Sequence, residues 1–192
     1  MNRRSVLYSL VVVVIAALLM IVPLATHASA QVSSSPNSPP LRNRIQEFEP
    51  VLMTGATAYS LFTTDESSSH QVWYRISGGD ALFRQRLRVY RENAAPRPQN
   101  ELPSDSARQQ EITSNAPTDW FMFPAGSGVF TYYFDGDHRS GGGQNWENAF
   151  GVKVRRTRFA NGNLYDLGFE DQESLDDFND LELQVVILQP MS

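Results

Sequence analysis

The sequence contains no cysteine. This absence excludes disulfide bonds, a thiolate nucleophile, zinc held by cysteine and a lipid anchor attached through cysteine. An exported protein of this composition must depend on its hydrophobic core, with a bound metal as a further source of stability. The chain has 192 residues, which is long enough for one domain with a substantial core.

Motifs of common enzyme classes are also missing. The sequence has no Gly-x-Ser-x-Gly nucleophile motif and no His-Glu-x-x-His metal motif, and only His138 of its three histidines lies in a plausible loop. A glycoside hydrolase with two carboxylates about 5–10 Å apart is the less favoured alternative, with Glu147, Glu170 and Asp180 as candidate acids. We therefore predict that the protein is not an enzyme.

Basic residues are too few to favour nucleic-acid binding. The chain has 16 lysines and arginines against 21 acidic residues, a formal net charge of −5. Removing the predicted N-terminal leader, which carries two arginines and no acidic residue, changes this charge to −7. Because proteins bind nucleic acids largely by neutralising phosphates with basic residues, we expect no nucleic-acid partner.

The first 30 residues have the pattern of a secretory signal peptide. Arg3 and Arg4 precede an apolar stretch over residues 6–24, and Ala28-Ser29-Ala30 supplies small residues for cleavage before Gln31. The pattern predicts an exported protein (extracellular, cell-surface or periplasmic) with no membrane span after cleavage. A retained anchor is the alternative, because the apolar stretch is close to the roughly 20 residues that cross a bilayer.

After the leader, short apolar segments alternate with turn residues, and helical periodicity is weak. Eight such segments predict an all-β fold, an antiparallel β-sandwich of jelly-roll-like type. The predicted strands are residues 52–62, 71–76, 82–90, 120–123, 129–134, 150–158, 163–169 and 181–188. We expect Asn161-Gly162 to join the strands 150–158 and 163–169 in a two-residue hairpin, because both central positions of that turn need positive φ.

Two polar segments interrupt or precede these strands. Residues 31–48 are rich in serine and proline and predict a flexible leader to a single domain over residues 49–190. Residues 91–118 contain four prolines and few apolar side chains, so we expect a long disordered loop there.

The densest charge in the chain lies between two predicted strands near the C-terminus. Eight carboxylates occur between Asp166 and Glu182. Crowded carboxylates repel one another unless a cation, a basic group or water offsets them, and Ca²⁺ prefers oxygen ligands of this kind. A solvated acidic turn is the alternative. The predicted Ca²⁺ ligands are Glu170, Asp171, Asp177, Asn179 and Asp180, with Asp176 as a possible substitute.

The same segment resembles a known signature. Phe169-Glu170-Asp171, followed by Asp177-Phe178-Asn179-Asp180 and an apolar strand, is similar to the C-terminal "GFED" and "DFND" motifs of an exported bacterial family, domain of unknown function 4114. The resemblance covers residues 132–187 and is closest over the last twenty of them. It implies a β-sandwich module of surface or secreted proteins, often in calcium-associated settings, without an established activity. The gap at 172–176 lacks the glycines usual in that family.

A second acidic segment, Asp135-Gly136-Asp137, follows the predicted strand 129–134 and precedes three consecutive glycines. It does not fit an EF-hand loop, because Trp146 occupies the position of the terminal glutamate. We expect a flexible hairpin loop. Asp135 and Asp137 are candidate binding residues that could join the C-terminal acidic site if the strand ends meet.

Aromatic and basic residues suggest the other function class, a module that binds a glycan or a cell-surface protein without metal. Trp146 lies in a polar segment and is the aromatic residue most expected to be exposed and to stack on a sugar. Arg84, Arg86 and Arg88 share one face of the predicted strand 82–90, and we expect that face to be solvated. The favoured prediction remains a non-catalytic module stabilised by Ca²⁺.

Overall fold

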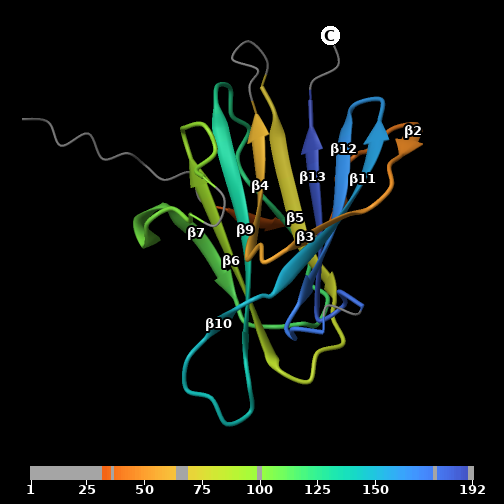
Figure 1. Ribbon diagram of the computed structural model, residues 1–192. Helices are drawn as coiled ribbons and strands as arrows, with labels where there is room; N and C mark the ends of the chain where they lie inside the picture. Colours follow the sequence, from red (N-terminus) through yellow and green to blue (C-terminus); the bar gives the residue numbers. More distant parts are fainter. Residues whose placement is uncertain (1–31, 36, 64–68, 99–100, 175–176, 190–192) are drawn as a thin grey trace, which may run out of the picture.

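The computed structural model describes residues 32–35, 37–63, 69–98, 101–174 and 177–189 (Figure 1). The predicted signal peptide lies outside these residues, as does Asp176. No helix in the described ranges is long and apolar enough to cross a membrane.

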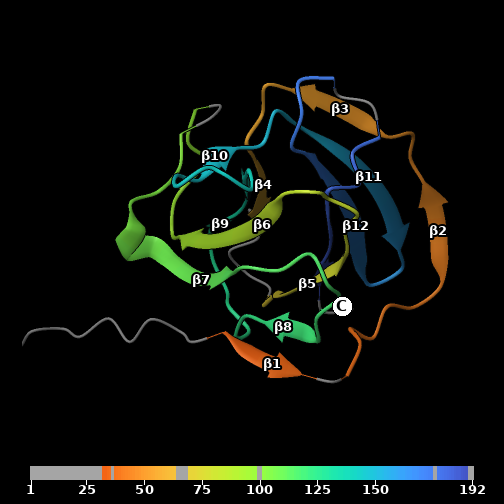
Figure 2. The same cartoon turned by 90° about the horizontal axis from the view of Figure 1, so that it is seen from below.

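The larger of two sheets, sheet A, has eight strands, and every pair in it is antiparallel. The strand β3 (Val51–Thr54) pairs with β11 (Gly151–Phe159) beside β2 (Arg44–Glu47), so that β2 and β3 together form one edge (Figure 2). The order across the sheet is β1 (Ser33–Ser35), β8 (Trp120–Met122), β5 (Gln71–Gly78), β13 (Leu181–Leu188), β12 (Gly162–Glu170), β11 (Gly151–Phe159) and β2 (Arg44–Glu47).

The second sheet, sheet B, has five strands and packs against the first. The long strand β9 (Phe130–Arg139) lies between β6 (Arg84–Glu92) on one side and the strands β4 (Ala58–Thr63) and β10 (Glu147–Asn148) on the other. The predicted antiparallel β-sandwich is therefore confirmed. The strands of sheet B are β4 (Ala58–Thr63), β6 (Arg84–Glu92), β7 (Arg108–Ile112), β9 (Phe130–Arg139) and β10 (Glu147–Asn148).

Alternation along the strands builds the core between the sheets. In β13, Leu181, Leu183, Val185 and Ile187 face inward and are buried, as their spacing predicts. A second, smaller apolar cluster covers part of the outer face of sheet A. Its buried members are Trp73, Trp120, Val186 and Leu188, and Leu41 packs against them.

The described part of the predicted flexible leader is held against sheet A by backbone pairing, by hydrogen bonds and by the contact of Leu41 with the outer cluster. β1 pairs with β8, and β2 pairs with β11. Asn161 ties the intervening segment down, because its side chain accepts a hydrogen bond from the Arg42 N–H (2.8 Å) and donates one to the Pro40 carbonyl (2.8 Å). Backbone pairing and one apolar contact order a segment whose composition alone predicts flexibility.

The expectation of a disordered loop over residues 91–118 is also wrong for its described part. β6 extends to Glu92, and β7 pairs with β6 after a short 3₁₀ helix, η1 (Asp105–Ala107). Arg97 pairs with Glu92 (2.6 Å), and the Arg97 backbone N–H donates to the Tyr133 hydroxyl (3.0 Å). These polar contacts replace the apolar side chains that the segment lacks.

The hairpin between β11 and β12 is confirmed, but its turn differs from the prediction. Phe159 pairs with Gly162, so the two turn residues are Ala160 and Asn161. Gly162 is required for a different reason: a Cβ there would lie 2.2 Å from the Ile187 carbonyl oxygen of β13. The predicted strand 52–62 is likewise divided at Gly55 (φ 72°), and its halves join different sheets.

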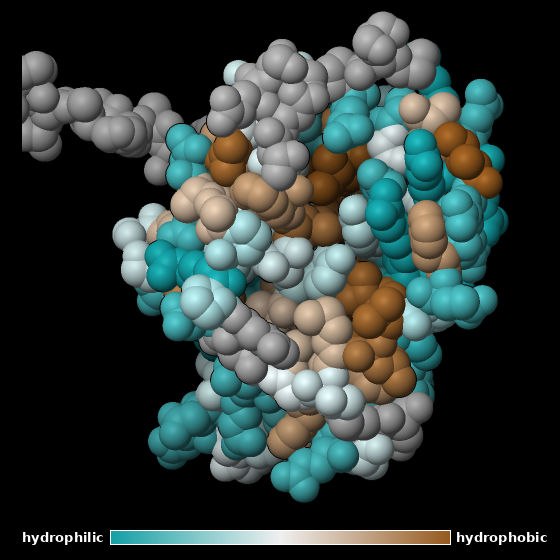
Figure 3. Space-filling view, turned by 45° about the horizontal axis from the view of Figure 1, so that its top comes forward, coloured by the Kyte–Doolittle hydropathy of each residue, from teal (hydrophilic) through white to brown (hydrophobic). Residues whose placement is uncertain are grey.

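Several large apolar side chains remain exposed. On the face shown in Figure 3, hydrophobic residues form separate patches among hydrophilic ones rather than one continuous surface. Among the residues that the structure describes, the exposed large apolar ones are Ile45, Val51, Leu52, Phe62 and Leu82.

Candidate metal site

Three acidic residues come together where β12 ends and β13 begins. Glu170 is the last residue of β12, Asp171 follows it, and Asp180 precedes β13. Because Phe169 pairs with Leu181, the two strand ends lie side by side. One carboxylate oxygen from each residue lies within 4.8 Å of those of the other two, and the three residues are only 1%, 3% and 6% exposed, respectively. We call this group the acidic triad.

Hydrogen bonds fix the orientation of each carboxylate in the triad. The Asp171 backbone N–H donates to Asp180 Oδ2 at 2.7 Å, and the Phe178 N–H donates to Glu170 Oε2 at 3.1 Å. Gln85 of β6 reaches across from sheet B and donates its Nε2 to Asp171 Oδ2 at 2.8 Å. The acidic triad therefore joins the two strand ends and the opposite sheet.

The backbone around the acidic triad is folded tightly by two glycines. Phe178 adopts a left-handed conformation (φ 58°), and its carbonyl oxygen lies 2.1 Å from where a Cβ at Gly168 would stand. A Cβ at Gly79 would likewise lie 2.4 Å from the Asp180 carbonyl oxygen. Residues with side chains at these positions would push the 177–180 segment away from sheet A.

The carboxyl groups of the acidic triad are buried without a basic partner in the described ranges. Burial raises the pKa of Glu170, and its hydrogen bond with Asp180 raises that pKa further. Burial also raises the pKa of Asp171 and Asp180, although the hydrogen bonds that they accept from Gln85 and the Asp171 N–H oppose the shift. No arginine or lysine in the described ranges forms an ion pair with any of the three. Each of the three residues offers a carboxylate oxygen, so the acidic triad could hold a metal ion.

The structure gathers three of the five predicted ligands. Asp177 is exposed and lies outside the triad, and its Oδ1 accepts the Asn179 N–H at 3.4 Å. The Asn179 carbonyl accepts a hydrogen bond from the Asp80 N–H at 2.9 Å. Gln85 was missed by the sequence analysis. Its signal is a single amide on the inner face of a strand whose neighbouring inner positions are apolar.

Asp135 and Asp137 do not join the acidic triad, because the predicted hairpin loop is wrong. β9 continues through these residues to Arg139. Gly136 faces inward against Phe169 (a Cβ there would lie 2.5 Å from the ring), so its two neighbours face the outer side of sheet B. Asp135 and Asp137 are 0% and 2% exposed.

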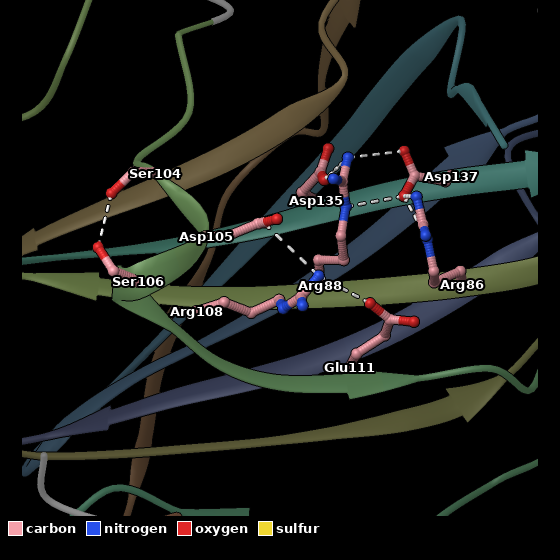
Figure 4. Close-up of polar contacts among 9 residues, drawn as sticks. All are labelled: Arg86, Arg88, Ser104, Asp105, Ser106, Arg108, Glu111, Asp135 and Asp137. Carbon is pink, nitrogen blue, oxygen red and sulfur yellow. Dashed lines mark hydrogen bonds and ion pairs between the residues drawn. The ribbon is translucent and has the colours of Figure 1, made fainter.

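The arginines that the sequence analysis expects to be solvated neutralise these two carboxylates (Figure 4). Arg88 contacts both, with its NH2 nitrogen 2.6 Å from Asp135 Oδ2 and its Nε 2.9 Å from Asp137 Oδ2. Arg86 NH2 lies 2.7 Å from Asp137 Oδ2. We call these four residues the arginine–aspartate cluster. The η1 segment and β7 lie beside it in Figure 4.

Trp146 is not the open platform that the sequence predicts. It is half-buried, and the guanidinium carbons of Arg86 and Arg139 lie 4.5 Å and 5.0 Å from its ring centroid. The candidate hydrolase acids are also in different settings. Glu147 is exposed on β10 of sheet B, whereas Glu170 and Asp180 are buried at the end of sheet A.

No protein family, curated protein or solved structure matches this chain.

Proposed function

We propose that the protein is a secreted or cell-surface β-sandwich module without catalytic activity, and that Ca²⁺ bound at the acidic triad stabilises it. One observation carries the proposal: three buried carboxylates lie within 4.8 Å of one another and form no ion pair within the described residues. Export is inferred from the leader pattern and from the resemblance to the family named above.

The chemistry of the donors favours a hard cation. Glu170, Asp171 and Asp180 supply oxygen only, and neither histidine nor cysteine belongs to the group. Zinc sites in proteins use mainly nitrogen and sulfur, whereas Ca²⁺ takes six to eight oxygens from carboxylates, carbonyls and water in flexible geometry. When bound, the ion would neutralise the buried charge and hold the end of β12 to the start of β13.

Thermal unfolding tests this proposal. Adding CaCl₂ to metal-free protein should raise the melting temperature, because a ligand at 100 times its Kd stabilises the folded state by about 2.7 kcal/mol. Asp180→Asn should abolish the increase, since the amide keeps the acceptor for the Asp171 N–H but removes one charge. Identical melting curves in CaCl₂ and in chelator would contradict the proposal.

Asp177→Asn is the matched control for that experiment. Asp177 belongs to the same acidic segment but is exposed and outside the triad. Its substitution should change stability by less than about 0.5 kcal/mol and leave the response to CaCl₂ intact. Loss of the response in this variant would show that the ligand set extends beyond the triad.

A further inference from the structure

A groove of about 400 Å³ lies over the outer face of sheet A, away from sheet B. Its floor consists of outward-facing side chains of β11, β12 and β13, which alternate with the core residues of those strands. Pro50 lines it beside β3, and Asp177 and Phe178 line it beside the acidic triad. The groove therefore crosses the strands in the middle of the sheet.

The floor carries a row of polar side chains that hold one another in place. Gln184 Nε2 donates to Asp166 Oδ1 at 3.1 Å, and the NH2 group of Arg75 donates to Gln184 Oε1 at 2.7 Å. On the other side, Arg155 Nε lies 3.8 Å from Asp166 Oδ2. These contacts span β11, β12, β13 and β5, so they present donors and acceptors in a fixed order.

Glycine shapes one end of the groove. In the adjacent row of side chains, Gly168 lies between Lys153 and Glu182, and Gly78 follows Glu182. The Phe178 carbonyl oxygen lies 2.1 Å from where a Cβ at Gly168 would stand, so this glycine lets the 177–180 segment lie against sheet A and line the groove. Lys153 and Glu182 line the groove on either side of Gly168.

The lining matches a ligand that both donates and accepts hydrogen bonds without carrying charge. Two basic residues face three acidic ones, and Gln184 adds an amide. Such a lining offers no excess of positive charge to an anionic ligand and few apolar side chains to a hydrophobic one. It also offers no free backbone edge to a peptide strand, because β12 and β13 are paired on both sides.

We propose that this groove binds neutral sugar residues of a glycan through Arg155, Asp166 and Gln184, with Arg75 holding the Gln184 amide in place. Hydroxyl groups donate and accept, as this row requires. The cation is expected to strengthen binding, because the Phe178 N–H donates to Glu170 and Phe178 lines the groove. That last link depends on the proposed cation site, whereas the groove itself does not.

The test is an array of neutral and acidic oligosaccharides probed with the full chain, followed by calorimetric titration of the neutral oligosaccharide that binds best. Gln184→Ala and Asp166→Ala should each weaken binding about tenfold, the equivalent of one hydrogen bond. Glu111→Ala on β7 of sheet B is the control, and it should leave affinity unchanged. If Gln184→Ala does not fold, Lys153→Gln at the groove provides the second variant.

Each result has a defined meaning. The groove proposal would be overturned if the protein bound only acidic oligosaccharides on the array, or if it bound no oligosaccharide. Binding that survives both Gln184→Ala and Asp166→Ala, or that is lost in Trp146→Ala, would also overturn it. Neutral-glycan binding that is equal in CaCl₂ and in chelator would support the groove and remove its link to the cation. If CaCl₂ raises the melting temperature but no glycan binds, the proposed cation site would be supported and the proposed glycan site in the groove would be overturned.

Discussion

The acidic triad and the arginine–aspartate cluster bury their carboxylates to a similar degree, yet they solve the charge problem differently. Arg86 and Arg88 lie beside Asp135 and Asp137 on the neighbouring strand, so their positive charge comes with the fold. The acidic triad has only hydrogen-bond donors around it in the described structure. The comparison shows that the two groups of carboxylates differ in their counter-charge rather than in their burial.

The largest expected effect comes from removing the shared counter-charge of the arginine–aspartate cluster. Arg88→Met should destabilise the protein by about 3–5 kcal/mol, because Asp135 and Asp137 would remain buried with Arg86 alone. Chemical denaturation measures the loss. Arg84→Met on the same strand is the control, since Arg84 is exposed and its removal should cost less than about 0.5 kcal/mol. Equal effects of the two substitutions would contradict the role given to the cluster.

Neutralising one carboxylate should depend on Ca²⁺ in the acidic triad but not in the arginine–aspartate cluster. Asp137→Asn should cost about 2 kcal/mol with or without Ca²⁺, because it weakens contacts with Arg86 and Arg88. Asp180→Asn should cost nothing in chelator, where it removes an uncompensated charge. In CaCl₂ its free energy of unfolding should be lower than that of the unsubstituted protein, by the amount that the bound ion contributes. Parallel behaviour of the two variants in both conditions would remove the distinction.

The smallest expected effect is a change with pH. The folded-state pKa values of the acidic triad are raised, so the stability gained from its protons is full below the ordinary carboxyl pKa of about 4 and is lost as pH rises through the raised values. Because Ca²⁺ binds the deprotonated carboxylates, the Ca²⁺-induced rise in melting temperature should grow with pH across this range.

The other buried acid requires a correction in that experiment. Burial raises the pKa of Asp135 to about 7, and the neighbouring Asp137 adds to the shift despite Arg88. Its contribution to stability is therefore lost as pH rises through about 7, whether Ca²⁺ is present or not. Subtracting melting temperatures with and without Ca²⁺ at each pH isolates the acidic triad. A Ca²⁺ effect that is constant with pH would contradict the triad as the site.

The strands could be predicted because the alternation of apolar and polar residues along a strand is visible in a single sequence. The pattern of β13 and the pairing of β11 with β12 follow from local residues. The order of β1 and β2 and the course of residues 91–118 depend on distant partners such as Trp120 and Tyr133, which composition does not indicate. Segments held by backbone pairing and single polar contacts therefore escaped prediction.

The site was predictable in part for the same reason. Glu170, Asp171 and Asp180 flank two neighbouring strands, so sequence alone brings them close. Arg86 and Arg88 are matched to Asp137 and Asp135 only by the register of β6 against β9, and that register links residues roughly 50 positions apart. A row of arginines looks solvated until the facing strand is known.

The central position of β13 in sheet A has a consequence for how the molecule acquires its structure. β13 lies between β12 and β5, and its contact with β5 joins Arg75 to Gln184 across 109 positions of sequence. Closing so long a loop is slow, and sheets with such distant pairings fold late. β5 therefore lacks its main partner, and the core one wall, until β13 has been synthesised. The two sheets can therefore enclose a complete core only after β13 has paired with β5 and β12.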